Sequence, residues 1–328
     1  MLEKMTKSPY FPKLYASVEN KNGYMASIME DLNSDLHKLS STIKQPDFPL
    51  AKKMNWILQM LTGIQDLHSK NYIHRDLKLS NVMLTGEVSD DAASIKIIDL
   101  GGCCNVSEKS ESRCSINCAL TPQYSAPEQW SGPKMNKSWN NFTPERMKKY
   151  DIFSAGLIIL QLFSGPDCHL ESNVLAEEMC VKKYAAKCEI NGKAEYYHYQ
   201  NLEKLDALRY LGVDVDGGNV PVELLQKMLQ TRHGNRAGIG LAINLCTRFM
   251  NEKGIPVASS VVDTSRQQAP KCLEQCQTQN CEAQCFIAQD GSSEQAVCEA
   301  GDNKDKKDKE SKSSKLSEKY FLRSRSEL

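Results

Sequence analysis

The chain has 328 residues, and its 41 lysines and arginines balance 41 acidic residues, so the formal net charge at pH 7 is zero. This balance provides no global attraction to nucleic acid or to an acidic membrane, and we expect neither as a partner. The start of the chain has no long apolar run typical of a secretory signal, so the 13 cysteines are expected to be mostly reduced thiols of an intracellular, cytoplasmic protein.

The first predicted elements are a β-hairpin and a long helix. Apolar and polar residues alternate over residues 10–32 around a turn at residues 19–23, which is typical of two paired strands. A hairpin of two strands is marginal alone, so this one needs a partner surface. An amphipathic helix is predicted over residues 51–70, and Asn71 is expected to end it in a left-handed turn. Its apolar face consists of Met54, Ile57, Leu61, Ile64 and Leu67.

Two short strands and a second helix follow along the chain. Residues 82–84 and 95–98 have the composition of strands and are joined by a polar loop. A strongly apolar helix is expected to open at Asp151 and to stop at Gly165 and Pro166. Its apolar segment, residues 152–163, is too short to span a bilayer, so we expect a buried core helix.

The last helical patterns occupy residues 222–229 and 239–249, and the composition changes after about residue 251. Gln, Ser, Asp and Lys dominate there, so we expect a largely disordered tail. The tail contains four cysteines in the spacing C-x3-C-x4-C-x3-C, which could bind zinc tetrahedrally. On one straight helix the two pairs would point to nearly opposite faces, so free thiols are the alternative. The four are Cys272, Cys276, Cys281 and Cys285.

The segment from Ile73 to Asn81 reads I-H-R-D-L-K-L-S-N and contains three residues with separable chemical tasks. The Asp76 carboxylate could accept the proton of an attacking hydroxyl group. The Lys78 ammonium could neutralise a phosphoryl group during its transfer. The Asn81 side chain could hold a magnesium ion between phosphates. The spacing H-R-D-L-x-x-x-N therefore predicts a catalytic loop for phosphoryl transfer.

Two further motifs follow the catalytic loop in a fixed order. Asp99-Leu100-Gly101 comes 18 residues after Asn81, and residues 121–128 read T-P-Q-Y-S-A-P-E. With the catalytic loop, they resemble the motifs of eukaryotic-type protein kinases over roughly residues 10–250. The resemblance implies an α+β, protein-kinase-like fold with a mostly helical C-lobe and a remnant of the β-rich N-lobe.

The same resemblance implies a site for ATP and Mg²⁺. Asn81 and Asp99 would be the magnesium ligands, and Asp76 and Lys78 would act on the substrate hydroxyl and the phosphoryl group. Met83 would pack beneath the adenine ring. The gatekeeper and hinge, whose backbone would bond the adenine, would be Met29, Glu30, Asp31 and Leu32.

Lys78 and Thr121 resemble the serine/threonine branch of the family, so the implied substrate is serine or threonine in a protein. Such kinases often use the arginine before the catalytic aspartate to clamp a phosphate on the activation segment. Arg75 holds that position, and Ser112 and Ser115 are the candidate phosphorylation sites. A merely solvated serine-rich loop is the alternative.

Further positions would have structural roles in such a fold. Glu128 would form a buried ion pair with Arg236. Asp151 would hold the backbone of the catalytic loop by hydrogen bonds. His74 and Leu100 would stack in the regulatory hydrophobic column of the lobe.

The front of the chain departs from the family pattern, because no G-x-G-x-x-G loop and no strand lysine precede the hairpin. We expect residues 1–34 to be a remnant of the N-lobe, residues 35–252 the C-lobe with an insertion near residues 167–218, and residues 253–328 the tail. Two explanations stay open. The sequence is an N-terminally truncated form of a working enzyme, or the chain is a catalytically silent scaffold or pseudokinase binding module. The intact set of Asp76, Asn81 and Asp99 favours the first.

Overall fold

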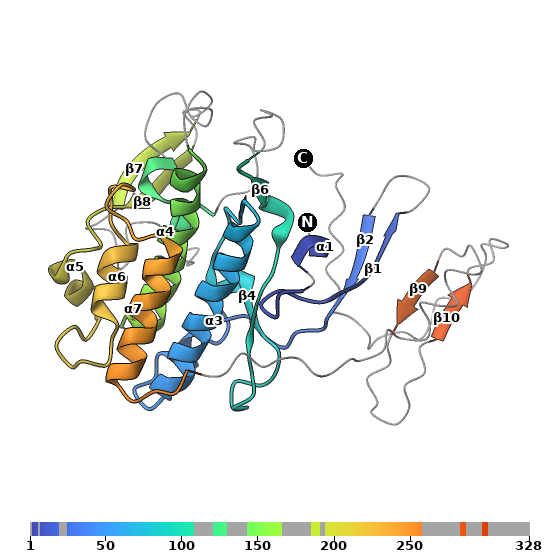
Figure 1. Ribbon diagram of the computed structural model, residues 1–328, viewed down its shortest axis with the longest axis horizontal. Helices are drawn as coiled ribbons and strands as arrows, with labels where there is room; N and C mark the ends of the chain where they lie inside the picture. The colour runs from blue at the N-terminus through green and yellow to red at the C-terminus, as the bar shows by residue number, and fades with distance from the viewer. Residues whose placement is uncertain are drawn as a thin grey trace. The chain divides into compact units, whose positions relative to one another are not determined.

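The computed structural model describes residues 2–5, 7–19, 25–107, 121–129, 143–165, 185–190, 194–257, 283–286 and 297–300 (Figure 1). The chain divides into two units. The first unit consists of Met1–Pro12 with Asp31–Val262, and the second consists of Lys13–Glu30 with Asp263–Leu328. The first unit contains the predicted catalytic loop.

The second unit contains two antiparallel strand pairs. The predicted hairpin is confirmed as β1 (Leu14–Glu19) paired with β2 (Met25–Met29), with an irregularity between Leu14 and Ala16. The other pair, β9 (Ala283–Phe286) and β10 (Val297–Ala300), lies in the tail that was expected to be largely disordered. Cys285 is opposite Cys298 in its register, whereas Cys272, Cys276 and Cys281 lie outside the described residues.

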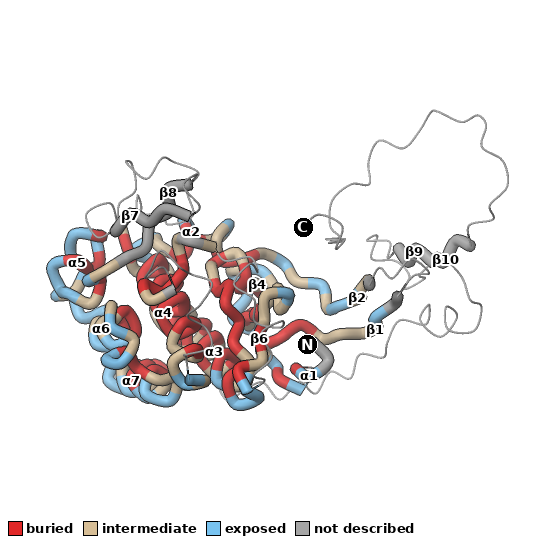
Figure 2. The backbone as a smooth tube through the Cα atoms, turned by 90° about the horizontal axis from the view of Figure 1, so that it is seen from above, coloured by how far each residue is buried: buried red, intermediate tan, exposed pale blue. Residues whose placement is uncertain are grey.

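Two long helices form the core of the first unit. The predicted amphipathic helix is α3 (Leu50–Ser69), and Asn71 follows it with a left-handed φ of 61° as expected. The second, α4 (Pro144–Phe163), is buried at every residue from Tyr150 to Leu162 (Figure 2). A helix that is apolar on all sides must be enclosed by other elements. α4 contacts α3 and α6 (Val222–Met228), and α7 (Ile239–Glu252) contacts α3 and α6.

The start of α4 corrects the sequence prediction. The helix begins at Pro144, so Asp151 lies about two turns inside it and does not open it. Thr143 is the N-cap, and its hydroxyl accepts a hydrogen bond from the Arg146 amide at 3.3 Å. Pro144 at the first position and Glu145 in the first turn also favour a helix start. The apolar run had drawn the prediction to the buried part of the helix.

Short strands and 3-10 turns position the loops of the site. The predicted strands are confirmed as β4 (Val82–Leu84) paired with β5 (Ile95–Ile97), and β3 (Tyr72–Ile73) pairs with β6 (Cys104–Asn105). The segment after the hairpin runs beside β4, because the Asn33 amide donates to Leu84 O at 2.9 Å and the Leu36 amide to Val82 O at 2.8 Å. The 3-10 turns are η1 (Leu79–Asn81), η2 (Leu100–Gly102), η3 (Pro122–Tyr124) and η4 (Pro127–Gln129).

Residues 2–5 and 7–12 belong to the helical unit and pack within it. α1 (Leu2–Met5) ends at the buried Met5, and the Ser8 hydroxyl donates to Asp66 of α3 at 2.6 Å. The Tyr10 carbonyl accepts the Ile97 amide at 2.8 Å. A Cβ on Gly63 would lie 2.8 Å from the Tyr10 Cβ, so a glycine is needed where this segment crosses α3.

The region expected to be an insertion contains a strand pair and a short helix. β7 (Ala185–Ile190) pairs with β8 (Ala194–Tyr199), and β8 contacts η3. α5 (Leu205–Tyr210) follows, and α2 (Ser40–Ile43) contacts α4. Among the described residues, no helix combines the length and the apolar character needed to cross a bilayer.

Candidate active site

The carboxylate of Asp76 is at the centre of the predicted catalytic loop and accepts four hydrogen bonds. Its Oδ1 accepts from the Thr121 amide at 3.0 Å and from the Thr121 hydroxyl at 2.6 Å. Its Oδ2 accepts from Lys78 Nζ at 3.0 Å and from Asn81 Nδ2 at 3.3 Å. These four donors fix the orientation of the carboxylate. The structure thus brings together Asp76, Lys78 and Asn81, which the sequence had predicted as catalytic residues, and adds Thr121 of the activation segment to them.

The ammonium group of Lys78 bridges the base candidate and the activation segment. It lies 3.0 Å from Asp76 Oδ2 and donates to the Thr121 hydroxyl at 3.0 Å. The Thr121 hydroxyl therefore accepts from Lys78 and donates to Asp76. Because a quarter of the Lys78 side chain stays exposed, at 23%, its charge can also act on a group that enters from solvent.

Hydrogen bonds connect the two segments that contain the candidate magnesium ligands, Asn81 and Asp99. The amide nitrogen of Asn81 donates to Asp76 O at 2.7 Å, which leaves the amide oxygen available as a ligand. The Ile98 amide donates to Asn81 O at 3.0 Å, so the residue just before Asp99 is fixed to the catalytic loop. Asp99 itself is left-handed with φ of 57°, and a Cβ on Gly101 would lie 3.2 Å from Asp99 Oδ1.

The donor set suits a magnesium ion better than a softer metal. An amide oxygen and a carboxylate are hard ligands, and Mg²⁺ is commonly held by one or two protein oxygens with phosphate oxygens and water. The described ranges contain no group of three or more His, Cys, Asp or Glu side chains that could hold a metal. Asn81 and Asp99 would hold the ion. A cation held there would supply positive charge that neutralises negative charge on phosphate groups.

Asp151 of α4 anchors the catalytic loop, as the sequence predicted. Its Oδ2 accepts from the His74 amide at 2.8 Å and faces His68 Nε2 at 2.8 Å, and its Oδ1 accepts from the Arg75 amide at 2.9 Å. Burial alone would raise the pKa of this carboxyl group, but the His68 hydrogen bond and the neighbouring His74 lower it below its usual value. The anion is therefore stable in the core and orients two successive backbone amides.

His74 and Arg75 are held further by their side chains. His74 Nε2 bonds to Ile98 O at 2.9 Å, and its Nδ1 faces the Asp76 amide at 3.3 Å, so the Nε2 proton is the one present. Arg75 has a left-handed φ of 71°, and its Nε donates to Gly102 O at 2.6 Å. The clamp on a phosphorylated segment stays a prediction, since Ser112 and Ser115 lie outside the described residues. Leu100 is partly buried against the core, and its stacking with His74 also stays a prediction.

The expected ion pair between Glu128 and Arg236 is present and bidentate. Arg236 Nη1 lies 2.7 Å from Glu128 Oε1, and Nη2 lies 3.0 Å from Oε2. The Arg236 side chain is 0% exposed and that of Glu128 is 9% exposed. The remaining guanidinium protons go to Lys149 O and Gln230 O, and the group lies over the Phe153 ring at 4.8 Å. This pair fastens the end of the activation segment to the loop before α7.

The predicted nucleotide contacts are divided between the two units. Met29 and Glu30 belong to the second unit, where Met29 is exposed and Glu30 Oε2 accepts the Lys13 amide at 3.0 Å. Leu32 and Met83 belong to the first unit and are partly exposed. Their contacts with adenine stay predictions.

Sequence reasoning missed two residues that support the site from the core helices. His68, at the end of α3, binds Asp151, and Ser154 of α4 donates to Tyr124 O at 2.7 Å. Tyr124 OH also bonds to Gln161 on the same helix. A histidine six residues before His74 was a visible signal, whereas nothing local marks Ser154 as a partner of the activation segment.

The α+β fold and the grouping of an aspartate, a lysine and an asparagine at this loop are typical of a protein kinase lobe. A family model described as the protein kinase domain matches residues 1–250. The chain belongs to the eukaryotic-type serine/threonine protein kinase family, with its α+β kinase-like fold.

Several curated kinases are similar to the chain. The serine/threonine-protein kinase STN7, chloroplastic, of Arabidopsis thaliana is 30% identical over 237 residues, which are 66% of this chain and 38% of the relative. The kinase shk2 of Schizosaccharomyces pombe is 31% identical over 146 residues, covering 44% of this chain and 21% of the relative. Protein kinase C delta type of Mus musculus is 36% identical over 160 residues, covering 48% and 21%. The chain thus spans well under two thirds of these relatives.

Proposed function

We propose that the protein transfers the γ-phosphoryl group of ATP to serine or threonine hydroxyls of protein substrates, with Mg²⁺ as the metal. The observation that carries this proposal is the 2.6 Å hydrogen bond from the Thr121 hydroxyl to Asp76. It supports the idea that an alcohol hydroxyl can donate to this carboxylate within reach of Lys78. A cytoplasmic location belongs to the proposal as a prediction.

In the proposed reaction, Asp76 accepts the proton of the substrate hydroxyl as its oxygen attacks the γ-phosphorus. The new bond joins that oxygen to phosphorus, and the bond from phosphorus to the bridging oxygen of ADP breaks. Lys78, 3.0 Å from the base, neutralises negative charge on the group in transfer. Asn81 and Asp99 are proposed to hold the metal. The hydrogen bonds to Asp76 keep the carboxylate oriented, which is the main contribution a protein makes to this chemistry.

The experiment combines transfer and binding. The full chain is incubated with radiolabelled ATP, MgCl₂ and a serine-rich protein such as casein, and its melting temperature is measured with and without Mg-ATP. We expect label on serine or threonine and a rise in melting temperature that needs the metal. If no label is transferred and Mg-ATP does not change the melting temperature, the proposal is contradicted. That result would favour the alternative of a catalytically silent binding module.

A further inference from the structure

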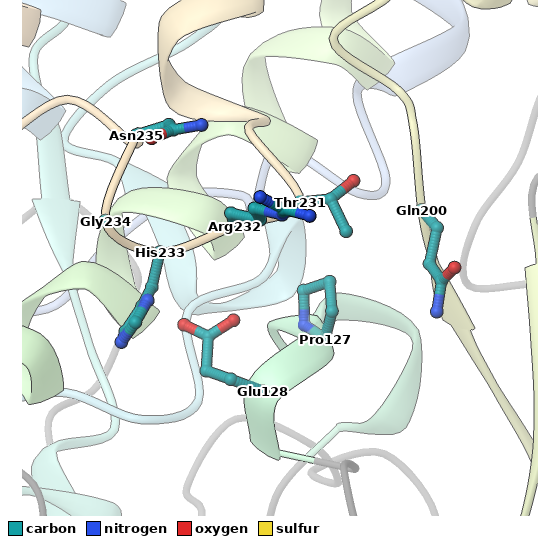
Figure 3. Close-up of a pocket in the computed structure, with 8 residues that line it drawn as sticks. All are labelled: Pro127, Glu128, Gln200, Thr231, Arg232, His233, Gly234 and Asn235. Carbon is teal, nitrogen blue, oxygen red and sulfur yellow. The ribbon is translucent and has the colours of Figure 1, made fainter.

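A pocket of about 400 Å³ opens beside the end of the activation segment (Figure 3). Its walls come from three parts of the first unit: η4, the residue after β8, and the loop between α6 and α7. Arg232 lies between His233 and Gln200, with Pro127 and Glu128 below it (Figure 3). The volume falls in the range of sites that bind small groups. None of these lining residues takes part in the proposed phosphoryl transfer.

Three polar side chains on the pocket wall are available to a ligand. In the part of the chain that the structure describes, the side chains of Arg232, His233 and Asn235 form no hydrogen bond or ion pair. Glu128 differs from them, because both of its oxygens are bound to Arg236. A ligand that enters the pocket therefore meets a guanidinium, an imidazole and an amide that have no competing partner among the described residues.

The charges around the pocket are mostly positive. Burial first, and then the cations Arg146, Arg236 and Lys149, lower the pKa of His233, while Glu128 opposes them. This lowering of the pKa favours the neutral form of the His233 imidazole. Arg232 adds another cation at the pocket wall. The nearby carboxylates that oppose these four cations are Glu128 and Glu203, which accepts from Thr231 at 3.2 Å.

The pocket is within reach of a peptide held at the proposed catalytic site. Pro127 follows Thr121 by six residues, and Thr121 is hydrogen-bonded to Asp76. Six residues span at most about 20 Å when extended, and the 3-10 turns η3 and η4 shorten this segment. A substrate that lies along the segment would place a residue in the pocket within about six positions of its phosphorylated hydroxyl.

We propose that this pocket binds the carboxylate of an aspartate or glutamate in the protein substrate, within about six residues of the phosphorylated serine or threonine. Arg232 supplies the ion pair, and Asn235 and neutral His233 supply hydrogen-bond donors. That the bound protein is a substrate rests on the proposed kinase function, but the binding of its carboxylate needs neither ATP nor metal.

The test measures peptide binding to the full chain without nucleotide. Each fluorescein-labelled peptide contains a central serine among alanines and glycines and a single glutamate, whose position differs from peptide to peptide. Fluorescence anisotropy gives the Kd of each peptide for the protein. We expect glutamate at one or two positions to bind about two- to fivefold more tightly than glutamine there, because exposed ion pairs contribute modestly. This preference should shrink as salt concentration rises.

The variant Arg232→Gln should lose the preference for glutamate, and Arg248→Gln is the matched control. Arg248 is an exposed arginine on α7, paired with Glu223, and lies nine residues or about 14 Å beyond the start of that helix. A glutamate preference that persists in Arg232→Gln, or is lost equally in Arg248→Gln, would overturn the proposal.

Three more outcomes test the assignment to a carboxylate and separate this inference from the proposed function. If phosphoserine at the same position binds tightly while glutamate binds no better than glutamine, the pocket accepts phosphate and the assignment to a carboxylate is wrong. If the chain transfers phosphate but shows no glutamate preference, the inference fails and the kinase proposal stands. If the preference depends on Arg232 in a chain without transfer activity, the pocket is a peptide site and the kinase proposal fails alone.

Discussion

Replacing Arg236 by methionine should destabilise the first unit strongly. The substitution removes five hydrogen bonds to Glu128, Lys149 O and Gln230 O and leaves the Glu128 carboxylate, 9% exposed, without its partner. Removing one member of a buried ion pair costs about 3–5 kcal/mol, because the remaining charge stays desolvated. In a unit of this size each kcal/mol lowers Tm by about 2–4 °C, so we expect a loss of about 6–20 °C.

The assay is urea unfolding of the wild type and the variant, followed by tryptophan fluorescence. Trp56 is 2% exposed in α3, so it reports on the core of this unit. The control is Arg248→Met, whose ion pair with Glu223 is about half exposed and should contribute less than about 1 kcal/mol. The double variant Glu128→Gln with Arg236→Met should be more stable than Arg236→Met alone, since it removes the unpaired charge. A loss of under about 1 kcal/mol in Arg236→Met would refute this reasoning.

Two further predictions concern the packing of α3. Gly63→Ala should lower the free energy of unfolding by about 1–3 kcal/mol, because the new Cβ would lie 2.8 Å from the Tyr10 Cβ and 2.9 Å from Ile97 Cδ1. Gly240→Ala in α7 meets nothing within 4 Å, so it should be neutral or stabilising, and equal effects in chemical denaturation would contradict the packing argument. Burial lowers the pKa of Lys53 to about 8, so the folded state binds fewer protons than the unfolded state from that pH up to about 10.5. Lys53 therefore contributes a rise in stability with pH across this window, so the stability difference between the wild type and Lys53→Met should shift in favour of the wild type as pH rises from about 8 to about 10.5.

Local sequence patterns predicted those helices and turns whose conformation is determined by a few neighbouring residues. The spacing of apolar residues located α3, and Asn71 ended it in the expected left-handed conformation. The start of α4 was placed seven residues too late because its first two turns carry a cap and charges rather than apolar side chains. A closer reading of Thr143-Pro144-Glu145 would have found it.

Contacts between distant segments were predictable only where a family motif named both partners. Glu128 and Arg236, 108 residues apart, were paired on that basis, and so was Asp151 with the catalytic loop. No motif joined Lys53 to Leu162 O, which it contacts at 2.9 Å across 109 residues. The pocket beside Pro127 escaped prediction for the same reason, since three separate elements form it.

The central claim is that Asp76 is the base for phosphoryl transfer to a hydroxyl group, and the rate of transfer in Asp76→Asn tests it most directly. The matched control is Asp91→Asn. Asp91 lies in the loop between β4 and β5, and its exposed carboxylate pairs with Lys52 of α3. We expect transfer of radiolabelled phosphate to fall by about 10²- to 10⁴-fold in Asp76→Asn, with a thermal shift by Mg-ATP retained, and to stay unchanged in Asp91→Asn. Transfer at the wild-type rate in Asp76→Asn would contradict the account.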